Sequence, residues 1–252
     1  MRLLLINPNT SSEITDKVVT AARRVAAPGT EIVGLTGRFG ARYISDRASS
    51  AIAAHSALDA YASYDAPHDA VVLACFGDPG LLALREISPK PVIGMAEASI
   101  HAACAGDAAS RFGIVTGGRG WVSMLEEFVA SLGKASRLAV VKAIEKTGGA
   151  VAAEPDAALA DLGAACEACV AEHGADVVIL GGAGLAGLAA RLRGKSRVPL
   201  IDSVEAVVRR AEAVVSGAAP MERGISFAAP AESVGLAPGL AAMLRGTTRA
   251  RG

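Results

Sequence analysis

The stretch Asp69-Ala-Val-Val-Leu-Ala-Cys-Phe-Gly77 is repeated as Asp176-Val-Val-Ile-Leu-Gly-Gly-Ala-Gly184, and this repeat is the main guide to the fold. Each copy continues through a Leu-rich helical segment to a proline and a second matching run. These runs are Pro91-Val-Ile-Gly-Met-Ala-Glu-Ala98 and Pro199-Leu-Ile-Asp-Ser-Val-Glu-Ala206. Two long copies in one chain indicate a duplicated lobe rather than a solenoid, whose repeats are shorter and more numerous.

Each lobe also opens with a similar strand, Arg2-Leu-Leu-Leu-Ile-Asn7 in the first and Arg111-Phe-Gly-Ile-Val-Thr116 in the second. Short apolar runs alternate with longer alanine-rich segments. The predicted strands are residues 2–6, 31–35, 70–74, 92–94, 112–116, 136–141, 177–180 and 200–202. The predicted helices include residues 12–26, 51–63, 121–132, 156–173 and 204–215. This alternation is typical of the α/β class, with mostly parallel sheets covered by helices on both faces.

The two pseudo-symmetric lobes are expected to face each other across a cleft, where the loops at the strand ends bind a ligand. The first lobe is predicted to comprise residues 1–97 together with 205–252, and the second residues 98–204. The helix over 204–215 is expected to pack back on the first lobe. The tail from Ser216 to Gly252 is predicted as a surface extension with a short helix near 238–244.

The composition favours a protein that works on a small molecule. Lys+Arg and Asp+Glu balance at 25 each, so nothing suggests a nucleic acid or an anionic membrane as partner. No segment reaches the roughly 18 uninterrupted apolar residues of a membrane helix, and the first apolar run is too short for a signal peptide. We therefore expect a cytoplasmic protein whose 4 cysteines are reduced thiols. Assembly into a homo-oligomer is left open.

Cys75 is the candidate reactive group. It stands where an apolar strand ends, just before Asp78-Pro79, a pair typical of a helix start with aspartate at the N-cap. Free amides and the positive end of that helix would favour the thiolate, which is the form that acts as base or nucleophile. The alternative is a buried cysteine that packs as a small hydrophobic residue.

A polar loop follows the first strand of each lobe. Asn7-Pro-Asn-Thr-Ser-Ser12 can cap the following helix, bind a carboxylate or imide at its N-terminus, or do both. Thr116-Gly-Gly-Arg-Gly120 occupies the equivalent place and can offer backbone amides to the other end of a ligand. Neither loop has the spacing of a phosphate-binding loop or a dinucleotide fingerprint.

Cys166, Cys169 and His173 share one face of a predicted helix and invite a metal interpretation. No second cluster of ligands accompanies them, so burial in the core is favoured and no metal site is predicted. His101 and Cys104 give no better ligand set, and the chain lacks the spacing of a hydrolase triad.

Three motifs resemble one known family. Ile6-Asn-Pro-Asn-Thr-Ser11, Ala74-Cys-Phe-Gly-Asp-Pro-Gly80 and Leu180-Gly-Gly-Ala-Gly-Leu185 are similar to the hydantoin and allantoin racemase branch of the aspartate/glutamate racemase superfamily. The match extends to about residue 215. The resemblance implies an isomerase with its active site between two lobes and with no cofactor or metal. In that family one cysteine from each lobe flanks the stereocentre: one thiolate removes the proton, and the other thiol returns a proton on the opposite face.

The resemblance assigns roles residue by residue. Cys75 matches the first catalytic cysteine, and Ser49 and Ser50 correspond loosely to a loop near the substrate. The positions expected to bind substrate or to stabilise an enolate come from loops of both lobes: Asn7, Ser11, Tyr43, Ile44, Phe76, Gly77, Thr116, Gly117, Gly118, Ala183 and Gly184. Donors aimed at the developing charge are often the largest contribution to such catalysis.

Position 182 departs from the family pattern. The second cysteine would stand there, opposite Cys75 in the internal repeat, but the chain has Gly182. The protein then either racemises with another second-lobe acid or a water, or runs one-base chemistry such as decarboxylation of a substituted malonate. In the single-cysteine decarboxylases the cysteine belongs to the other lobe. The departure is also compatible with a maleate-type cis–trans isomerase, with a non-catalytic binder, or with a residue altered from the natural one.

We expect a cofactor-independent, racemase-like isomerase that acts at the α-carbon of a small carbonyl compound such as a hydantoin or ureide. Cys75 is the expected thiolate, and Gly182 marks the place of the missing second thiol.

Overall fold

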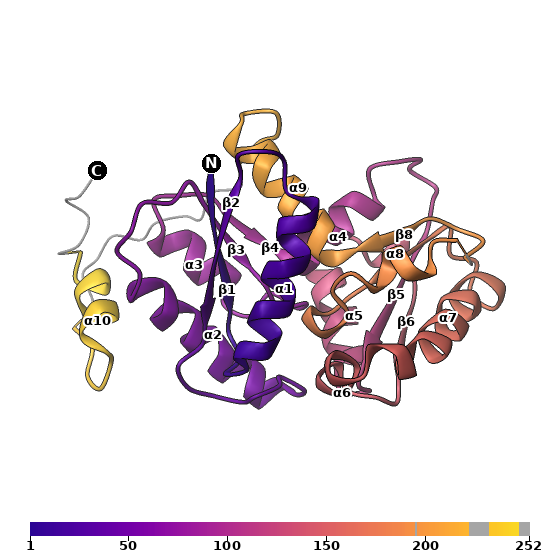
Figure 1. Ribbon diagram of the computed structural model, residues 1–252, viewed down its shortest axis with the longest axis horizontal. Coiled ribbons are helices and arrows are strands. Elements are labelled where there is room, and N and C mark those ends of the chain that lie inside the picture. Colours follow the sequence, from indigo (N-terminus) through magenta and orange to yellow (C-terminus); the bar gives the residue numbers. More distant parts are fainter. Residues whose placement is uncertain (195, 222–231, 247–252) are drawn as a thin grey trace.

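The computed structural model describes residues 1–194, 196–221 and 232–246. It has two lobes, each built on a parallel four-stranded sheet with helices packed against it (Figure 1). The predicted α/β architecture of two pseudo-symmetric lobes is confirmed.

The two sheets have the same strand order, which is the internal repeat in three dimensions. The first sheet runs β2-β1-β3-β4, with β1 Arg2–Asn7, β2 Glu31–Thr36, β3 Ala70–Leu73 and β4 Val92–Gly94. The second runs β6-β5-β7-β8, with β5 Phe112–Gly117, β6 Leu138–Ile144, β7 Val177–Leu180 and β8 Leu200–Asp202. In each sheet the two central strands are nearly continuous apolar runs, as expected where helices cover both faces.

The helices follow the strands in chain order. The first lobe contains α1 Ser12–Val25, α2 Arg47–Ala62, α3 Leu81–Ile87 and α4 Met95–Ala103. The second contains α5 Trp121–Ser131, α6 Gly148–Ala153, α7 Pro155–Ala171 and α8 Leu188–Leu192, with short 3-10 turns η1 Ala135–Arg137 and η2 Ala183–Leu185. The chain then continues into α9 Ser203–Val215 and α10 Pro238–Leu244. None of the described helices combines the length and apolar character needed to cross a lipid bilayer.

The core is continuous between the lobes. Successive side chains of a strand point to opposite faces, so Leu3 and Leu5 of β1 pack toward α1, α4 and α9, while Leu4 and Ile6 pack toward α2 and α3. Phe112, on the second sheet, belongs to the same cluster as Leu3 and Leu5. The lobes therefore share buried apolar surface, and this holds the facing strand ends in a fixed arrangement.

Helices α1, α4 and α9 lie between the sheets (Figure 1). Helix α4 contacts β7 and β8 of the second sheet as well as β4 of the first. Helix α9 follows the last strand of the second sheet but contacts α4 and α1 of the first lobe. The predicted tail helix is confirmed as α10, which contacts α2. The predicted extension also includes residues 222–231 and 247–252, which lie outside the described residues.

Candidate active site

A cleft of about 370 Å³ lies between the lobes and includes Cys75 in its wall. The first lobe contributes Asn9, Ile14, Tyr43, Ile44, Ala74, Cys75 and Phe76. The second contributes Thr116, Trp121, Gly182 and Ala183. The polar members stand at the carboxyl ends of the central strands β1, β3 and β5, and Gly182 stands at the end of β7. Such strand ends are where open α/β sheets bind ligands.

Cys75 is 7% exposed and lines the cleft from the turn after β3. Burial raises the pKa of this thiol, and the nearby charge of Asp78 adds to the effect. The expectation of a thiolate favoured by a helix N-terminus is therefore wrong for the free protein. A thiolate formed here is correspondingly a stronger base than an exposed one.

Asp78 has a different role from the predicted helix cap. The helix α3 begins only at Leu81, after Gly80, whose φ of 84° is left-handed. The Asp78 carboxylate instead accepts hydrogen bonds from the backbone N–H groups of Ala96 (3.0 Å) and Glu97 (2.8 Å), in the first turn of α4. Asp78 itself has a φ of 48°, and its N–H donates to the Cys75 carbonyl at 3.0 Å. Asp78 thus ties the cysteine turn to α4.

Asn7 and Ser11, the two predicted substrate-binding residues of the first polar loop, lie outside the cleft. Asn7 is fully buried, and its Nδ2 donates to Asn9 Oδ1 (2.8 Å), the Ser11 carbonyl (3.1 Å) and Thr15 Oγ1 (3.0 Å). The Ser11 hydroxyl caps α1 by accepting from the Ile14 N–H and donates to Glu13. Neither Asn7 nor Ser11 lines the cleft.

Asn9 lines the cleft in their place, and the sequence interpretation missed it. Its Oδ1 accepts from Asn7 Nδ2 and, at 2.9 Å, from the Ser11 N–H, which fixes the orientation of the amide. Its Nδ2 has no hydrogen-bond partner within residues 1–194, 196–221 and 232–246. Asn9 therefore offers a preoriented donor. The sequence feature that could have identified Asn9 as a cleft residue is its position two residues beyond the end of β1.

The first-lobe loop that carries Tyr43 and Ile44 closes onto the second lobe. The Tyr43 hydroxyl donates to the Gly117 carbonyl at 3.3 Å, and Trp121 Nε1 donates to the Ile44 carbonyl at 3.0 Å. Burial raises the pKa of Tyr43 to about 12. Trp121, the single tryptophan of the chain, was also missed, although it directly follows the predicted second-lobe loop.

Ser49 and Ser50 lie in the first turn of α2 and do not line the cleft. The Ser49 N–H donates to Asp46 Oδ1 at 2.7 Å, and its hydroxyl accepts from the Asp46 N–H, so Ser49 completes a capping box.

The second-lobe wall centres on Thr116 and Gly182. Thr116 is 3% exposed at the end of β5. Gly182 has φ 147° and ψ 137°, a backbone that favours glycine. A Cβ placed there would lie 3.3 Å from Leu185 Cδ1 and 4.0 Å from Thr116 Oγ1. The wall therefore has room for a side chain at position 182 but holds the backbone in a conformation that L-residues rarely adopt.

Of the remaining predicted positions, some line the cleft and others pack against neighbouring residues instead. Phe76 and Ala183 line the cleft. Gly77 packs under the Trp121 ring, and Gly117 and Gly184 pack against the backbone of Gly148, where side chains would collide. Gly118 has a φ of 86°, in the left-handed region, and does not line the cleft. The Gly184 carbonyl also accepts from Lys17 Nζ of α1 at 2.9 Å, which joins the lobes.

Cys166 and Cys169 are buried in the core of the second lobe, on α7. Burial raises their pKa values to about 12 and about 11. Within the described part of the chain, no group of three or more His, Cys, Asp or Glu side chains is placed to hold a metal ion.

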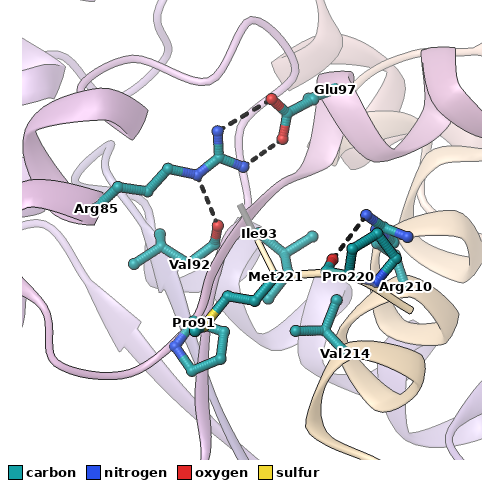
Figure 2. Close-up of a pocket in the computed structure, with 9 residues that line it drawn as sticks. All are labelled: Arg85, Pro91, Val92, Ile93, Glu97, Arg210, Val214, Pro220 and Met221. Atoms are coloured by element: carbon teal, nitrogen blue, oxygen red, sulfur yellow. Dashed lines mark hydrogen bonds and ion pairs between the residues drawn. The ribbon is translucent and has the colours of Figure 1, made fainter. Parts of the chain in front are cut away.

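A second hollow, of about 240 Å³, does not include Cys75 (Figure 2). Arg85 pairs there with Glu97 and donates to the Val92 carbonyl at 3.1 Å. The second copy of the internal repeat has the same pair, formed by Arg193 and Glu205. Because the pairing occurs in both copies, including the one without a cleft cysteine, we assign it a structural role in tying α3 to α4 and α8 to α9.

Two like α/β lobes with a thiol in the cleft between them define a class of protein that works on a small molecule held at the interface of its halves. The family model for Asp/Glu/Hydantoin racemase matches residues 3–211. A hydantoin racemase from Paenarthrobacter aurescens is 38% identical over 234 residues, which cover 92% of this chain and 98% of the relative. The chain belongs to the Asp/Glu/Hydantoin racemase family, as its three motifs indicated, and it is a racemase-type isomerase.

Solved structures agree with this assignment. Allantoin racemase from Pseudomonas fluorescens is 34% identical and superposes with a TM-score of 0.83, covering 88% of this chain and 94% of that one. Allantoin racemase from Klebsiella pneumoniae is 37% identical with a TM-score of 0.81, covering 88% of this chain and 90% of that one.

Proposed function

We propose that the protein racemises a hydantoin or related cyclic ureide at its substituted ring carbon, with Cys75 as the base. The observation that carries the proposal is the position of Cys75, whose thiol lines the cleft between the lobes. The named activities of the hydantoin and allantoin racemases that the chain resembles support the substrate class.

The chemistry of the cleft suits a ring with carbonyl groups and an apolar substituent. Asn9 Nδ2 is a donor for a ring carbonyl. The remaining surface is mainly apolar and aromatic: Ile14, Tyr43, Ile44, Ala74, Phe76, Trp121 and Ala183. A hydantoin with an aliphatic or aromatic substituent therefore fits better than one with a strongly polar substituent.

The reaction begins when the Cys75 thiolate removes the ring-carbon proton. The electron pair moves into the adjacent carbonyl, and the developing charge on its oxygen needs preoriented donors. Asn9 Nδ2 is one such donor. The backbone N–H groups of Phe76 and Gly77 are others, since they have no hydrogen-bond partner among the described residues. Because burial raises the pKa of Cys75, only a small fraction is thiolate at neutral pH, but that fraction is strongly basic.

The division of the chain into two lobes is part of this proposal, with the predicted boundary at residue 97 moved to the end of α4 because that residue lies inside the helix, and with residues 205–221 and 232–246 returned to the first lobe. It is supported by the ends of the sheets at Gly94 and Phe112 and by the contacts of α9 with α4 and α1. The four cysteines are free thiols, which supports a reducing compartment such as the cytoplasm.

The test is the decay of optical rotation of single-enantiomer hydantoins that carry benzyl, isobutyl or ureido substituents, measured against an enzyme-free blank. Rotation should fall to zero without a change in mass, fastest for the apolar substituents. Cys75→Ser should abolish the decay. Cys104→Ser should not, because Cys104 lies at the end of α4 outside the cleft. Persistent rotation for every hydantoin and ureide would reject the proposal. Carbon dioxide release from a disubstituted malonate would favour the decarboxylase.

A further inference from the structure

Inversion of a stereocentre requires a proton donor on the face opposite the base. If Cys75 removes the proton from the first-lobe side, as the proposed function holds, the returning proton must come from the second-lobe wall. That wall consists of Thr116, Trp121, Gly182 and Ala183. Gly182 and Ala183 have no acidic side chain, so the choice falls on the polar groups of the other two or on a water that they hold.

The other side-chain hydroxyl and N–H groups that reach this wall, those of Tyr43 and Trp121, already donate hydrogen bonds. Trp121 Nε1 donates to the Ile44 carbonyl at 3.0 Å. The Tyr43 hydroxyl reaches the same wall from the first lobe but donates to the Gly117 carbonyl. Releasing either proton to the substrate would break a contact that joins the lobes.

Thr116 differs from its counterpart in the repeat. Asn7 holds the equivalent position at the end of β1. Its side-chain amide donates hydrogen bonds to Asn9, to the Ser11 carbonyl and to Thr15. The loop after Thr116 is Gly117-Gly-Arg-Gly120 and lacks such short polar side chains. The Thr116 hydroxyl accordingly has no hydrogen-bond partner among the residues that the structure describes, although Thr116 is 3% exposed and lines the cleft. A buried hydroxyl without a protein partner is a place for a ligand or an ordered water.

The free hydroxyl faces the space that Gly182 leaves. The Cβ position of residue 182 lies 4.0 Å from Thr116 Oγ1, and its nearest neighbour is a leucine methyl group at 3.3 Å. A larger residue would project its side chain from this position next to Thr116. The glycine keeps the position clear for a molecule the size of water.

We propose that Thr116 is the positioning residue for proton return, and that its hydroxyl holds a water in the space beside Gly182 on the substrate face opposite Cys75. The Cys75 thiolate takes the ring-carbon proton and becomes a thiol. The enolate then takes a proton from the water on the other face, which forms the new C–H bond and leaves hydroxide. Hydroxide and the Cys75 thiol exchange a proton through the cleft to restore water and thiolate.

The test separates proton removal from inversion. Each enantiomer of a benzyl hydantoin is incubated in deuterium oxide, and deuterium at the ring carbon and the enantiomer ratio are followed together. Thr116→Val removes the hydroxyl and keeps the shape. It should lower kcat for inversion by at least about tenfold, which is less than the roughly 10²–10⁴-fold contribution of a directly positioned acid because Thr116 acts through the water. KM, and exchange from the enantiomer whose proton faces Cys75, should change by less than about twofold, because the thiolate step remains. Thr116→Ser should retain inversion. Thr20→Val, on the exposed face of α1, is the matched control and should change neither.

Repeating the Thr116→Val substitution in a Gly182→Cys variant makes the test specific to proton return. In Gly182→Cys a thiol supplies the proton, so adding Thr116→Val should then change inversion by less than about threefold, since coupled residues depart from additivity. Equal loss of exchange and inversion in Thr116→Val would overturn the proposal and assign Thr116 to substrate binding. Unchanged inversion would also overturn it. A wild-type protein that neither exchanges nor inverts any hydantoin would reject the proposed function itself.

Discussion

Gly182→Cys places a thiol on the second-lobe wall of the cleft, and its cost can be worked out from the backbone. Residue 182 has φ 147° and ψ 137°, where a non-glycine residue costs about 1–3 kcal/mol. The new Cβ would lie 3.3 Å from Leu185 Cδ1, a flexible methyl group that must move slightly, and 4.0 Å from Thr116 Oγ1. For a chain of this size we expect Tm to fall by about 2–12 °C.

The same substitution should raise racemisation. A thiol on the face opposite Cys75 supplies the second acid that inversion needs, and a positioned acid or base contributes about 10²–10⁴-fold. We expect kcat for the loss of optical rotation of a benzyl hydantoin to rise at least about tenfold, at the low end because the strained backbone can misdirect the thiol.

Gly182→Ala is the matched control, because it carries the backbone cost without the thiol. It should show a similar fall in Tm and no gain in rate. Equal rates for the Cys and Ala variants, with both folded by circular dichroism, would refute the role assigned to position 182.

Three other predictions concern the groups around Cys75. The pKa of buried Asp78 is raised from 3.8 to about 7, so the folded state holds a proton that the unfolded state releases; stability is greatest at acid pH and falls as pH rises through this window. Between pH 5 and 8 the free energy of unfolding, measured by urea unfolding, should drop by about 2–3 kcal/mol more in wild type than in Asp78→Asn. The same change of this free energy with pH in both proteins would contradict the titration of Asp78. Because burial raises the pKa of Cys75, kcat/KM for racemisation should climb about tenfold per pH unit through the neutral range, and a plateau beginning below pH 7 would show an ordinary or lowered thiol pKa. Trp121→Phe removes the hydrogen bond to the Ile44 carbonyl and should cost about 0.5–1.5 kcal/mol of stability and raise KM, measured by thermal unfolding and initial rates, whereas an unchanged KM would separate this loop from substrate binding.

The fold was predictable because its signals are local. Strands at Val92–Gly94, Val177–Leu180 and Leu200–Asp202 begin and end where the apolar runs do. The repeat also gave the correct relation between the lobes, since matching runs occupy matching strands of the two sheets. The start of β6 at Leu138 rather than Ser136 reflects the 3-10 turn Ala135–Arg137, which takes the preceding residues out of the strand.

The site was predicted less completely because its contacts are not local. Asp78-Pro79 has the sequence of a helix start, but the Asp78 carboxylate accepts hydrogen bonds from the backbone N–H groups of Ala96 and Glu97, which lie on another helix. The family resemblance pointed to Asn7 rather than to Asn9 in the same short loop, and only the three-dimensional path of the chain turns Asn7 inward.

Burial likewise cannot be seen from the motif around Cys75. The residues next to it suggested a helix dipole acting on the thiol, whereas the surrounding protein desolvates it and raises its pKa.

Deuterium incorporation at the ring carbon of one hydantoin enantiomer, followed by NMR in wild type and in Cys75→Ser, reports proton removal without depending on how the proton returns. We expect the wild-type protein to exchange this position at least about a hundredfold faster than Cys75→Ser, in line with the contribution of a general base. Exchange at the same rate in Cys75→Ser would show that another group removes the proton and that the thiol between the lobes is not the base.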